Sequence, residues 1–270
     1  MPWLTVGGAQ LAYRELGKGD PLVLVHGSGS QTELWGPALD DLSSSYRVVA
    51  YDRRGYGHSP HSPVRDYRRH VTDAIEIVRR LAGGRAVLVG HSSGGNVALA
   101  LAAKRPRLVR ALVVAEPPFH GLRYATGSFL TTIPHVKLSQ LRGRPQDAAA
   151  IFFRWVTSYR TGGNAFDRLP ADLRDLMIGN ARPLLAELDP HPSGALFEHL
   201  AMRSLAAIPA PITFLLAESS QPWFHRIHAE LVRAIPAIHT EHIPGASHFS
   251  NSDAPAEFVA AVRRGAARAS

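Results

Sequence analysis

Residues 86–97 read AVLVGHSSGGNV and contain a Gly-x-Ser-x-Gly pattern centred on Ser92. The apolar run from Ala86 to Val89 precedes the pattern and predicts a buried strand, while the alanine-rich run from Asn96 to Ala103 predicts a helix. The chain has 23 glycines, so the spacing alone is weak evidence. Its position between a strand and a helix is what makes the match meaningful.

A serine on such a tight turn takes strained backbone angles, and only small residues fit two positions before and after it. Gly90 and Gly94 occupy these positions. We expect the turn to lift the Ser92 hydroxyl above the sheet. It also places the N–H of Ser93 at the helix N-terminus, where it can bind a developing oxyanion. We interpret Ser92 as a nucleophile, and the alternative is a structural serine in a turn.

Strand and helix patterns alternate through the first half of the chain. Such alternation predicts a parallel sheet with helices on both faces. The remaining segments expected there are strands at Pro21–Val25, Tyr46–Tyr51 and Val109–Val114, and helices at Gln31–Leu42 and Arg65–Leu81.

The alternation stops after Pro118, and residues 119–207 show helical patterns without a convincing strand. We therefore expect a core of residues 1–118 and 208–270, interrupted by a helical lid of residues 119–207. The lid helices are expected at Gln146–Arg160, Ala171–Ile178 and Ala195–Leu205. The core is expected to resume with strands at Pro211–Leu216 and Ile238–Ile243 and helices at Trp223–Ile235 and Pro255–Arg264.

The composition excludes several classes of protein. With 270 residues, 45% apolar and 19% charged, the chain is globular and long enough to enclose a cavity. It has no cysteine, which excludes disulfides, thiolate metal sites and a cysteine nucleophile. No stretch reaches the ~18 apolar residues of a membrane helix, and the N-terminus lacks a secretory signal pattern. We expect a soluble, cytoplasmic protein with no membrane partner.

The net charge is +8, from 30 Lys+Arg against 22 Asp+Glu. A nucleic-acid-binding protein would gather such charge in a run or stripe. Here the arginine pairs are spread over the chain, and we interpret them as solvated faces with no nucleic-acid partner. The pairs are Arg53-Arg54, Arg68-Arg69, Arg79-Arg80 and Arg263-Arg264.

Three further motifs accompany the Ser92 turn: VHGSG at residues 25–29, YDRRGYGHS at 51–59 and GASH at 245–248. Together these motifs resemble the α/β-hydrolase family over essentially the whole chain. The resemblance implies an α/β fold with a mostly parallel α/β-hydrolase sheet flanked by helices, and a helical lid inserted after strand 6. It also implies that Ser28 lends its amide to the oxyanion hole and that Gly27 lies at the substrate. In this family the segment containing Asp52 is mainly structural.

A serine hydroxyl needs a base to take its proton. Among 14 histidines, His248 follows the last predicted strand in a glycine-containing loop, where the family places its base. We expect the His91 side chain to point away from the nucleophile and fill space. The pairs at 225/228 and 239/242 lack a third ligand pattern, so no metal site is expected.

The sequence departs from the family's pattern at the acid, because Ser220 stands where many members of the family that it resembles carry an aspartate. Glu116 ends the strand 109–115 and is followed by two prolines that fix the chain. A carboxylate there can reach the base from the neighbouring strand. Some branches of the family take their acid from this strand end. We expect Glu116 to be the acid, with Glu218 as the alternative.

The lid segment carries many aromatic residues, which suggests an apolar or aromatic substrate. Trp155 is the first choice for a pocket wall. We therefore expect a cofactor-free serine hydrolase, similar to the esterase and lactonase branch. It would cleave a small-molecule ester or lactone through an acyl-serine intermediate.

Two alternatives remain from sequence. The same fold hosts enzymes that act on C–C bonds and cofactor-free peroxidases or oxygenases. A non-enzymatic small-molecule receptor could also retain the scaffold. The sequence does not predict an oligomeric state.

Overall fold

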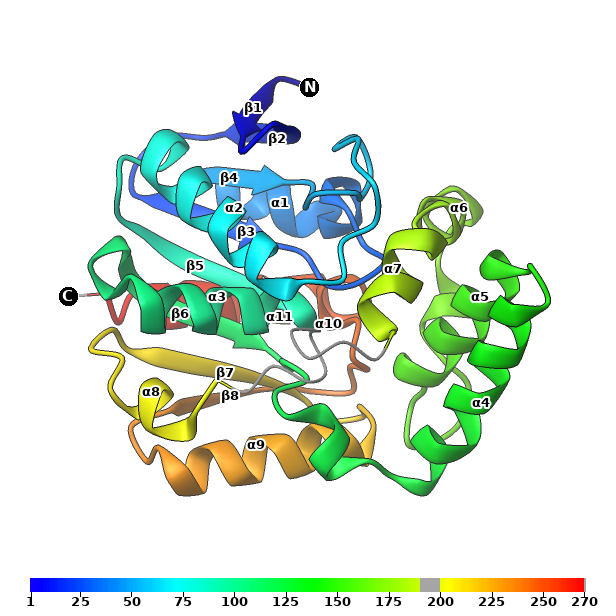
Figure 1. Cartoon of the computed structure of the whole chain (residues 1–270). Helices are drawn as coiled ribbons and strands as arrows, with labels where there is room; N and C mark the ends of the chain where they lie inside the picture. The colour runs from blue at the N-terminus through cyan, green and yellow to red at the C-terminus, as the bar shows by residue number, and fades with distance from the viewer. Residues whose placement is uncertain (190–199, 270) are drawn as a thin grey trace.

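A single eight-stranded sheet organises the chain in the computed structural model, which describes residues 1–189 and 200–269 (Figure 1). The strand order is β1-β2-β4-β3-β5-β6-β7-β8. β1 and β2 pair antiparallel with each other, and β2 pairs antiparallel with β4, while all later pairings are parallel. The strands are β1 Trp3–Val6, β2 Ala9–Leu16, β3 Pro21–Val25, β4 Arg47–Tyr51, β5 Ala86–His91, β6 Val109–Ala115, β7 Ile212–Ala217 and β8 His239–Ile243.

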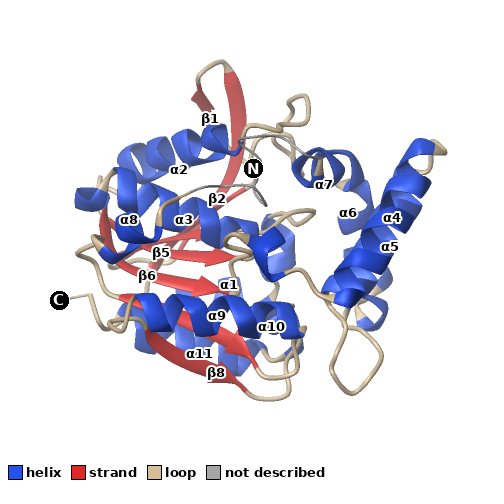
Figure 2. Ribbon diagram, turned by 60° about the horizontal axis from the view of Figure 1, so that its bottom comes forward, coloured by secondary structure: helices blue, strands red, loops and turns tan. Residues whose placement is uncertain are grey.

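Helices cover both faces of this sheet, and each face has its own apolar core (Figure 2). Side chains of α1 and α11 fill one core, and side chains of α2, α3 and α9 fill the other. These helices are α1 Pro37–Ser43, α2 Tyr67–Leu81, α3 Ser93–Lys104, α9 Pro222–Ala234 and α11 Pro255–Ala266. The short α10, Ser250–Asp253, precedes α11.

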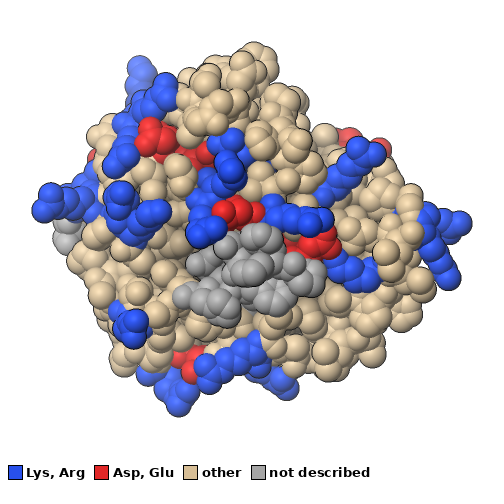
Figure 3. Space-filling model, viewed as in Figure 1, with Lys and Arg blue, Asp and Glu red and all other residues tan. Residues whose placement is uncertain are grey.

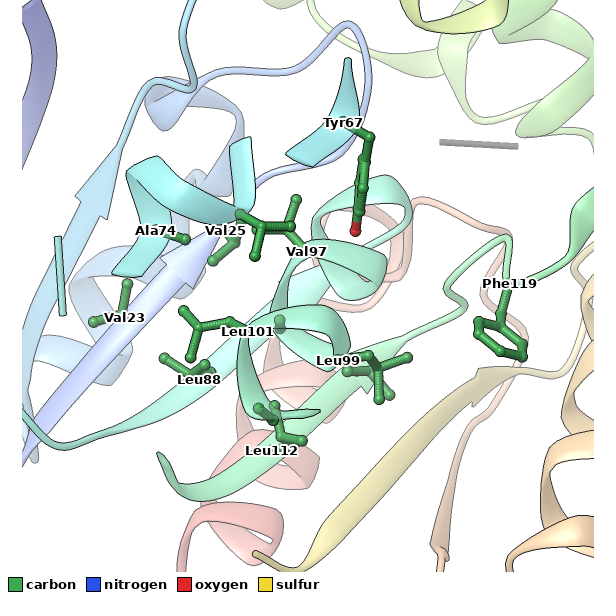
Figure 4. Close-up of a cluster of buried hydrophobic side chains, with 14 of the residues drawn as sticks. Val23, Val25, Tyr67, Ala74, Leu88, Val97, Leu99, Leu101, Leu112 and Phe119 are labelled. Atoms are coloured by element: carbon green, nitrogen blue, oxygen red, sulfur yellow. The ribbon is translucent and has the colours of Figure 1, made fainter. Parts of the chain in front are cut away.

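The alternation of side chains along a strand explains the two cores. In β3, Val23 and Val25 point into the core beneath α2 and α3, while Leu22 and Leu24 point into the opposite core. Figure 4 shows this first core, with Val97 and Leu101 of α3 above the sheet. A strand buried on both faces has no polar alternation, which is why the central strands read as continuous apolar runs.

Between β6 and β7 the chain forms several helices. α4 and α5 pack against each other and α5 against α7, beyond one end of the sheet (Figures 1 and 2). The short α8 instead packs on α3 and α9 of the core. The helices are α4 Gly127–Leu141, α5 Pro145–Val156, α6 Ala171–Gly179, α7 Ala181–Leu188 and α8 Met202–Ala206, with short 3-10 turns at Gly121–Tyr124 and Phe166–Arg168.

Some expected segments differ in detail. The helix expected at Gln31–Leu42 is split into a 3-10 turn, Thr32–Trp35, and α1, because Gly36 adopts a positive φ of 51°. The helix expected at Ala195–Leu205 falls partly outside the described residues, and α8 covers its end. α4 and α7 were not expected; α4 contains Pro134, which is unfavourable inside a helix.

The expectation that the arginine pairs are solvated is wrong for Arg53 and Arg54. Both are buried, because each side chain meets a buried carboxylate: Arg53 pairs with Glu187 at 2.8 Å and Arg54 with Asp73 at 2.6 Å. Elsewhere the Lys and Arg side chains form separate groups on the face seen in Figure 3, not one stripe. None of the helices in residues 1–189 and 200–269 has the length and apolarity needed to cross a membrane.

Candidate active site

Ser92 lies directly after β5 and before the first residue of α3, with φ 52° and ψ −127°. The crowding around this turn explains its glycines. A Cβ on Gly90 would lie 2.5 Å from the carbonyl oxygen of Gly94, and one on Gly94 would lie 2.1 Å from that of Val25. Neither contact is sterically possible, so the turn that presents Ser92 requires both glycines.

Glu116 and His248 form a buried pair at the carboxyl end of the sheet. His248 Nδ1 lies 2.8 Å from Glu116 Oε2, and each side chain is only 2% exposed. Glu116 follows β6 with a positive φ of 45°, which is unusual for a residue with a side chain. The strained backbone turns the carboxylate toward the loop after β8, where His248 lies.

The second oxygen of Glu116 is also fixed. Its Oε1 accepts a 2.6 Å hydrogen bond from Ser220 Oγ and a 3.0 Å hydrogen bond from the N–H of Ala217. Glu218, the alternative acid, is exposed. Within the described residues, the carboxylate that is hydrogen-bonded to His248 is that of Glu116.

Several contacts hold the His248 ring. His91 Nε2 lies 2.7 Å from the carbonyl oxygen of His248 and donates to it. Phe224 stacks on the His248 ring with centroids 4.0 Å apart and an interplanar angle of 9°. The carboxylate of Asp253 accepts hydrogen bonds from the N–H and hydroxyl of Ser247 and so fixes the same loop. His91 therefore supports the His248 loop as well as filling space beside the turn.

Burial controls the protonation of this pair. It lowers the pKa of His248, because the cation loses its hydration, and the Asp253 charge acts in the opposite direction. It raises the pKa of Glu116, while hydrogen bonds from Ser220 and Ala217 favour the charged carboxylate. A neutral imidazole at neutral pH is the form that can accept a proton from a serine.

Ser92 and His248 line the same pocket. No hydrogen bond joins them in the part of the chain that the structure describes. In unliganded enzymes such contacts are often long and tighten only when substrate binds. The arrangement brings together a strained serine, a buried imidazole and a carboxylate that orients the imidazole.

The pocket over Ser92 is mostly apolar and narrow. Its open volume of about 30 Å³ holds roughly two water molecules. Its aromatic lining comes from the helices after β6 and from the core: Phe129, Phe152, Phe153, Trp223, Phe224 and Phe249.

Trp155, the expected pocket wall, does not line this pocket. It is 7% exposed and lies behind the lining, with its ring centroid 5.5 Å from those of Phe129 and Trp223. Its indole N–H donates to Ser128 Oγ at 3.2 Å. The side chains that line the pocket in front of Trp155 include Phe129, Phe152 and Trp223.

Gly27, predicted to lie at the substrate, and Ser28 and Ser93, predicted to form the oxyanion hole, line the pocket beside Ser92. A Cβ on Gly27 would lie 2.9 Å from Ser92 Cβ, so only glycine lets the loop after β3 approach the turn this closely. Ser93 is the first residue of α3, where a backbone N–H has no acceptor within the helix. The hydroxyl oxygens of Ser28 and Ser93 are 2.8 Å apart.

Sequence reasoning missed Glu187, a carboxylate on α7 that lines the pocket and is 3% exposed. It pairs with Arg53, which lies 134 residues away in the chain. The local sequence ARPLLAEL contains one acid in an apolar run and gives no indication of this partner. Because Arg53 was interpreted as solvated, there was no reason to look for a buried carboxylate partner.

Asp52 is structural, as the resemblance implies. Its Oδ1 accepts hydrogen bonds from the N–H and hydroxyl of Thr32, and its Oδ2 accepts one from the N–H of His58. Asp52 also lies in a possible ligand cluster with Glu33 and His58. Because these hydrogen bonds already occupy the Asp52 oxygens, the cluster does not indicate a metal site.

Comparison with known proteins finds hydrolases among the sequence relatives and among the solved structures. The chain is 29% identical to 2-(acetamidomethylene)succinate hydrolase of Mesorhizobium japonicum, over 93% of this chain and 89% of the relative. It is 27% identical to the sn-1-specific diacylglycerol lipase ABHD11 of Danio rerio, over 91% and 78%. These relatives are hydrolases with different substrates.

The enol-lactonase of Burkholderia xenovorans shares the fold with a TM-score of 0.76 at 24% identity, covering 97% of this chain and 98% of the other. Residues 22–262 match the family described as "Alpha/beta hydrolase family". This match spans the sheet from β3 onward, the Ser92 turn and the His248 loop. The protein belongs to the alpha/beta hydrolase family.

Proposed function

We propose that the protein is a serine hydrolase that cleaves a carboxylic ester or lactone through an acyl-serine intermediate. The observation that carries this proposal is the buried 2.8 Å hydrogen bond between Glu116 and His248, in a pocket shared with Ser92 on its strained turn. A serine, an imidazole and a carboxylate are the three side chains that acyl transfer by a catalytic triad requires.

In the proposed reaction, His248 Nε2 accepts the Ser92 proton while Oγ attacks the carbonyl carbon. The tetrahedral intermediate collapses, and the C–O bond to the leaving group breaks. His248 then donates the proton to the leaving alkoxide. Water, deprotonated by His248, hydrolyses the acyl-serine and releases the acid. Glu116 orients the ring and stabilises its charged form at each step.

The backbone N–H groups of Ser28 and Ser93 would hold the oxyanion. Donors that are already in place lose no energy to reorganisation when charge develops, and removal of one such donor costs on the order of 3 kcal/mol of barrier. The reaction as proposed uses only side chains, backbone amides and water.

We further propose that residues 119–207 act as a lid over this pocket. Phe129, Phe152 and Phe153 from this segment line the pocket above Ser92. Their rings favour an apolar or aromatic group on the substrate. The two named relatives act on different compounds, so family membership does not by itself select a substrate.

The proposal is tested with a panel of p-nitrophenyl esters and lactones. We expect turnover that is lost in Ser92→Ala and retained in Ser44→Ala, an exposed serine of no proposed role. An organophosphonate should label Ser92 covalently, as seen by peptide mass spectrometry. Absence of both turnover and labelling would contradict a serine hydrolase. Labelling without ester or lactone turnover, but with cleavage of a β-diketone, would point to C–C bond hydrolysis.

A further inference from the structure

A carboxylate from the segment after β6 reaches the pocket next to the proposed oxyanion hole. Glu187, on α7, has its two oxygens in different surroundings. Oε1 lies 2.8 Å from Arg53 Nη1 and 3.1 Å from His70 Nε2, away from the proposed nucleophile. Oε2 accepts hydrogen bonds from the hydroxyl of Ser28, from that of Ser93 at 3.3 Å, and from Arg53 Nη2 at 3.4 Å.

The Glu187 carboxylate is ionised at neutral pH. Burial alone would raise the pKa of Glu187, but Arg53, His70 and the Ser28 hydroxyl outweigh it and hold the pKa well below its ordinary value. Arg53 is fully buried, and its guanidinium also lies over the Tyr56 ring at 4.7 Å. The pair is therefore a fixed dipole, with Arg53 behind and Glu187 Oε2 toward the serines.

The orientation of this dipole determines which charge a ligand in the pocket can carry. Glu187 is the one carboxylate among the described residues that line the pocket, and none of those residues is a lysine or arginine. The remaining lining is apolar apart from serines and two histidines with lowered pKa values. The pair has no net charge, but its carboxylate end faces a mostly apolar pocket. An anion beside the serines lies nearer to that carboxylate than to Arg53 and is repelled, since an apolar lining screens the charge only weakly.

We infer that Glu187 is a specificity-determining residue, which excludes substrates carrying a carboxylate near the scissile carbonyl and restricts the pocket to neutral esters and lactones. This inference rests on the proposed ester hydrolysis. Exclusion of acidic substrates would distinguish the substrate range of this protein from that of its relative in Mesorhizobium, whose named substrate is a substituted succinate. No described cationic side chain lines the pocket here to receive such an acid.

The first test uses three substrates of similar length with the unmodified protein. These are p-nitrophenyl pentanoate, the mono-p-nitrophenyl ester of succinate, and the methyl p-nitrophenyl diester of succinate. The diester has the same succinyl chain as the monoester but no charge. We expect kcat/KM for the two neutral esters to be similar, and kcat/KM for the anionic monoester to be at least about tenfold lower.

The second test removes the charge. In Glu187→Gln we expect the ratio of kcat/KM for the diester to that for the monoester to fall by about tenfold or more, since Arg53 is then left to attract the anion. Asp73→Asn is the matched control. It removes another buried carboxylate paired with a neighbouring arginine, but Asp73 does not line the pocket, so the ratio should stay unchanged.

Glu187→Gln leaves the buried Arg53 charge without its partner, which destabilises the fold, so the double variant Arg53→Met/Glu187→Met is measured as well. The ratio should also fall in this variant. Because the ratio is taken within one protein, a general loss of folded enzyme cancels from it. A purely structural role for Glu187 would lower both rates equally and leave the ratio at its original value.

The outcomes separate the inference from the proposed function. If the unmodified protein hydrolyses none of the three esters, the proposed function fails. If it hydrolyses the monoester as fast as the diester, or if the ratio is unchanged in both Glu187 variants, ester hydrolysis stands and the inference is overturned. A ratio that falls in the Glu187 variants and not in Asp73→Asn supports it.

Discussion

Ser220 Oγ donates a 2.6 Å hydrogen bond to Oε1 of Glu116, so the side chains at the ends of β7 and β6 meet at one point beside His248. Position 220 is the one at which, by resemblance, many family members carry their acid. Because Ser220 Oγ touches the carboxylate that contacts His248 Nδ1, we expect a carboxylate at position 220 to reach the same ring nitrogen. The serine at 220 serves as a hydrogen-bond donor to the carboxylate at 116.

We expect Glu116→Gln to lower kcat by several hundred-fold or more, approaching ~10⁴, because an amide neither orients His248 correctly nor stabilises its cation. Glu218→Gln is the matched control and should change kcat by less than about threefold, since Glu218 is exposed. Steady-state kinetics on a short p-nitrophenyl ester measure both. The reverse order of effects would identify Glu218 as the acid.

The convergence of positions 116 and 220 predicts that the acid can be relocated. Glu116→Ser should be nearly inactive, and Glu116→Ser/Ser220→Asp should recover at least about tenfold in kcat, because the new carboxylate lies within reach of His248. Ser220→Asp alone should lose activity, since two carboxylates would then crowd one buried site. No recovery in a double variant with native circular dichroism would count against a triad acid at this point.

Gly27 is predicted to be essential for catalysis and not for folding. In Gly27→Ala the new methyl group would lie 2.9 Å from Ser92 Cβ, which displaces the loop that carries Ser28. We expect kcat to fall about 10²–10³-fold, as for loss of an oxyanion donor. Gly179→Ala is the control, because a Cβ there meets nothing within 4 Å. Equal activity of the two variants would show that the loop tolerates the shift.

The aromatic cluster behind the pocket predicts different effects for two neighbouring side chains. Trp155→Ala should lower the free energy of unfolding by about 3–5 kcal/mol, because it leaves a cavity among buried rings. Phe152→Ala should instead change KM for bulky esters more than for acetate, since Phe152 lines the pocket. Urea unfolding and kinetics on paired substrates test this. A KM effect confined to Trp155→Ala would reverse the assignment.

Buried histidines predict a loss of stability in acid. Burial lowers the pKa of His91 to about 3, from an ordinary value near 6.5. Its folded-state pKa is depressed, so the stabilisation is present above pH 6.5, where both states are neutral. It is lost as the pH falls toward 3, because the unfolded chain binds the proton first.

His91→Gln should therefore make the fall of the unfolding free energy between pH 6 and 5 shallower, by about 1 kcal/mol per pH unit. Replacement of the exposed His61 by glutamine serves as the control and should leave the slope unchanged. The measurement is a set of urea titrations across this pH range. An identical slope in His91→Gln and the unmodified protein would contradict a neutral buried His91.

The central strands and the serine turn were predictable because each depends on residues that are close together in the sequence. The apolar runs at 21–25 and 86–89 are strands buried on both faces, and such strands carry no polar alternation. The serine turn was predictable because only glycine fits where the backbone crowds, as the contacts at Gly90 and Gly94 show. Helix boundaries were predicted less accurately than strands. A single glycine, Gly36, divides the segment that was expected to form one helix.

The sequence by itself determined the fold class, the turn that presents Ser92 and the loop that holds His248, because these follow from apolar periodicity and from positions where a side chain cannot fit. The tertiary structure decided which carboxylate meets His248, that Arg53 is buried against Glu187, and that Phe129 and Phe152 line the pocket in front of Trp155. These contacts join residues far apart in the chain. The sheet sets the distance between Glu116 and His248, and the packing of α4, α5 and α7 sets the others; no local pattern encodes either.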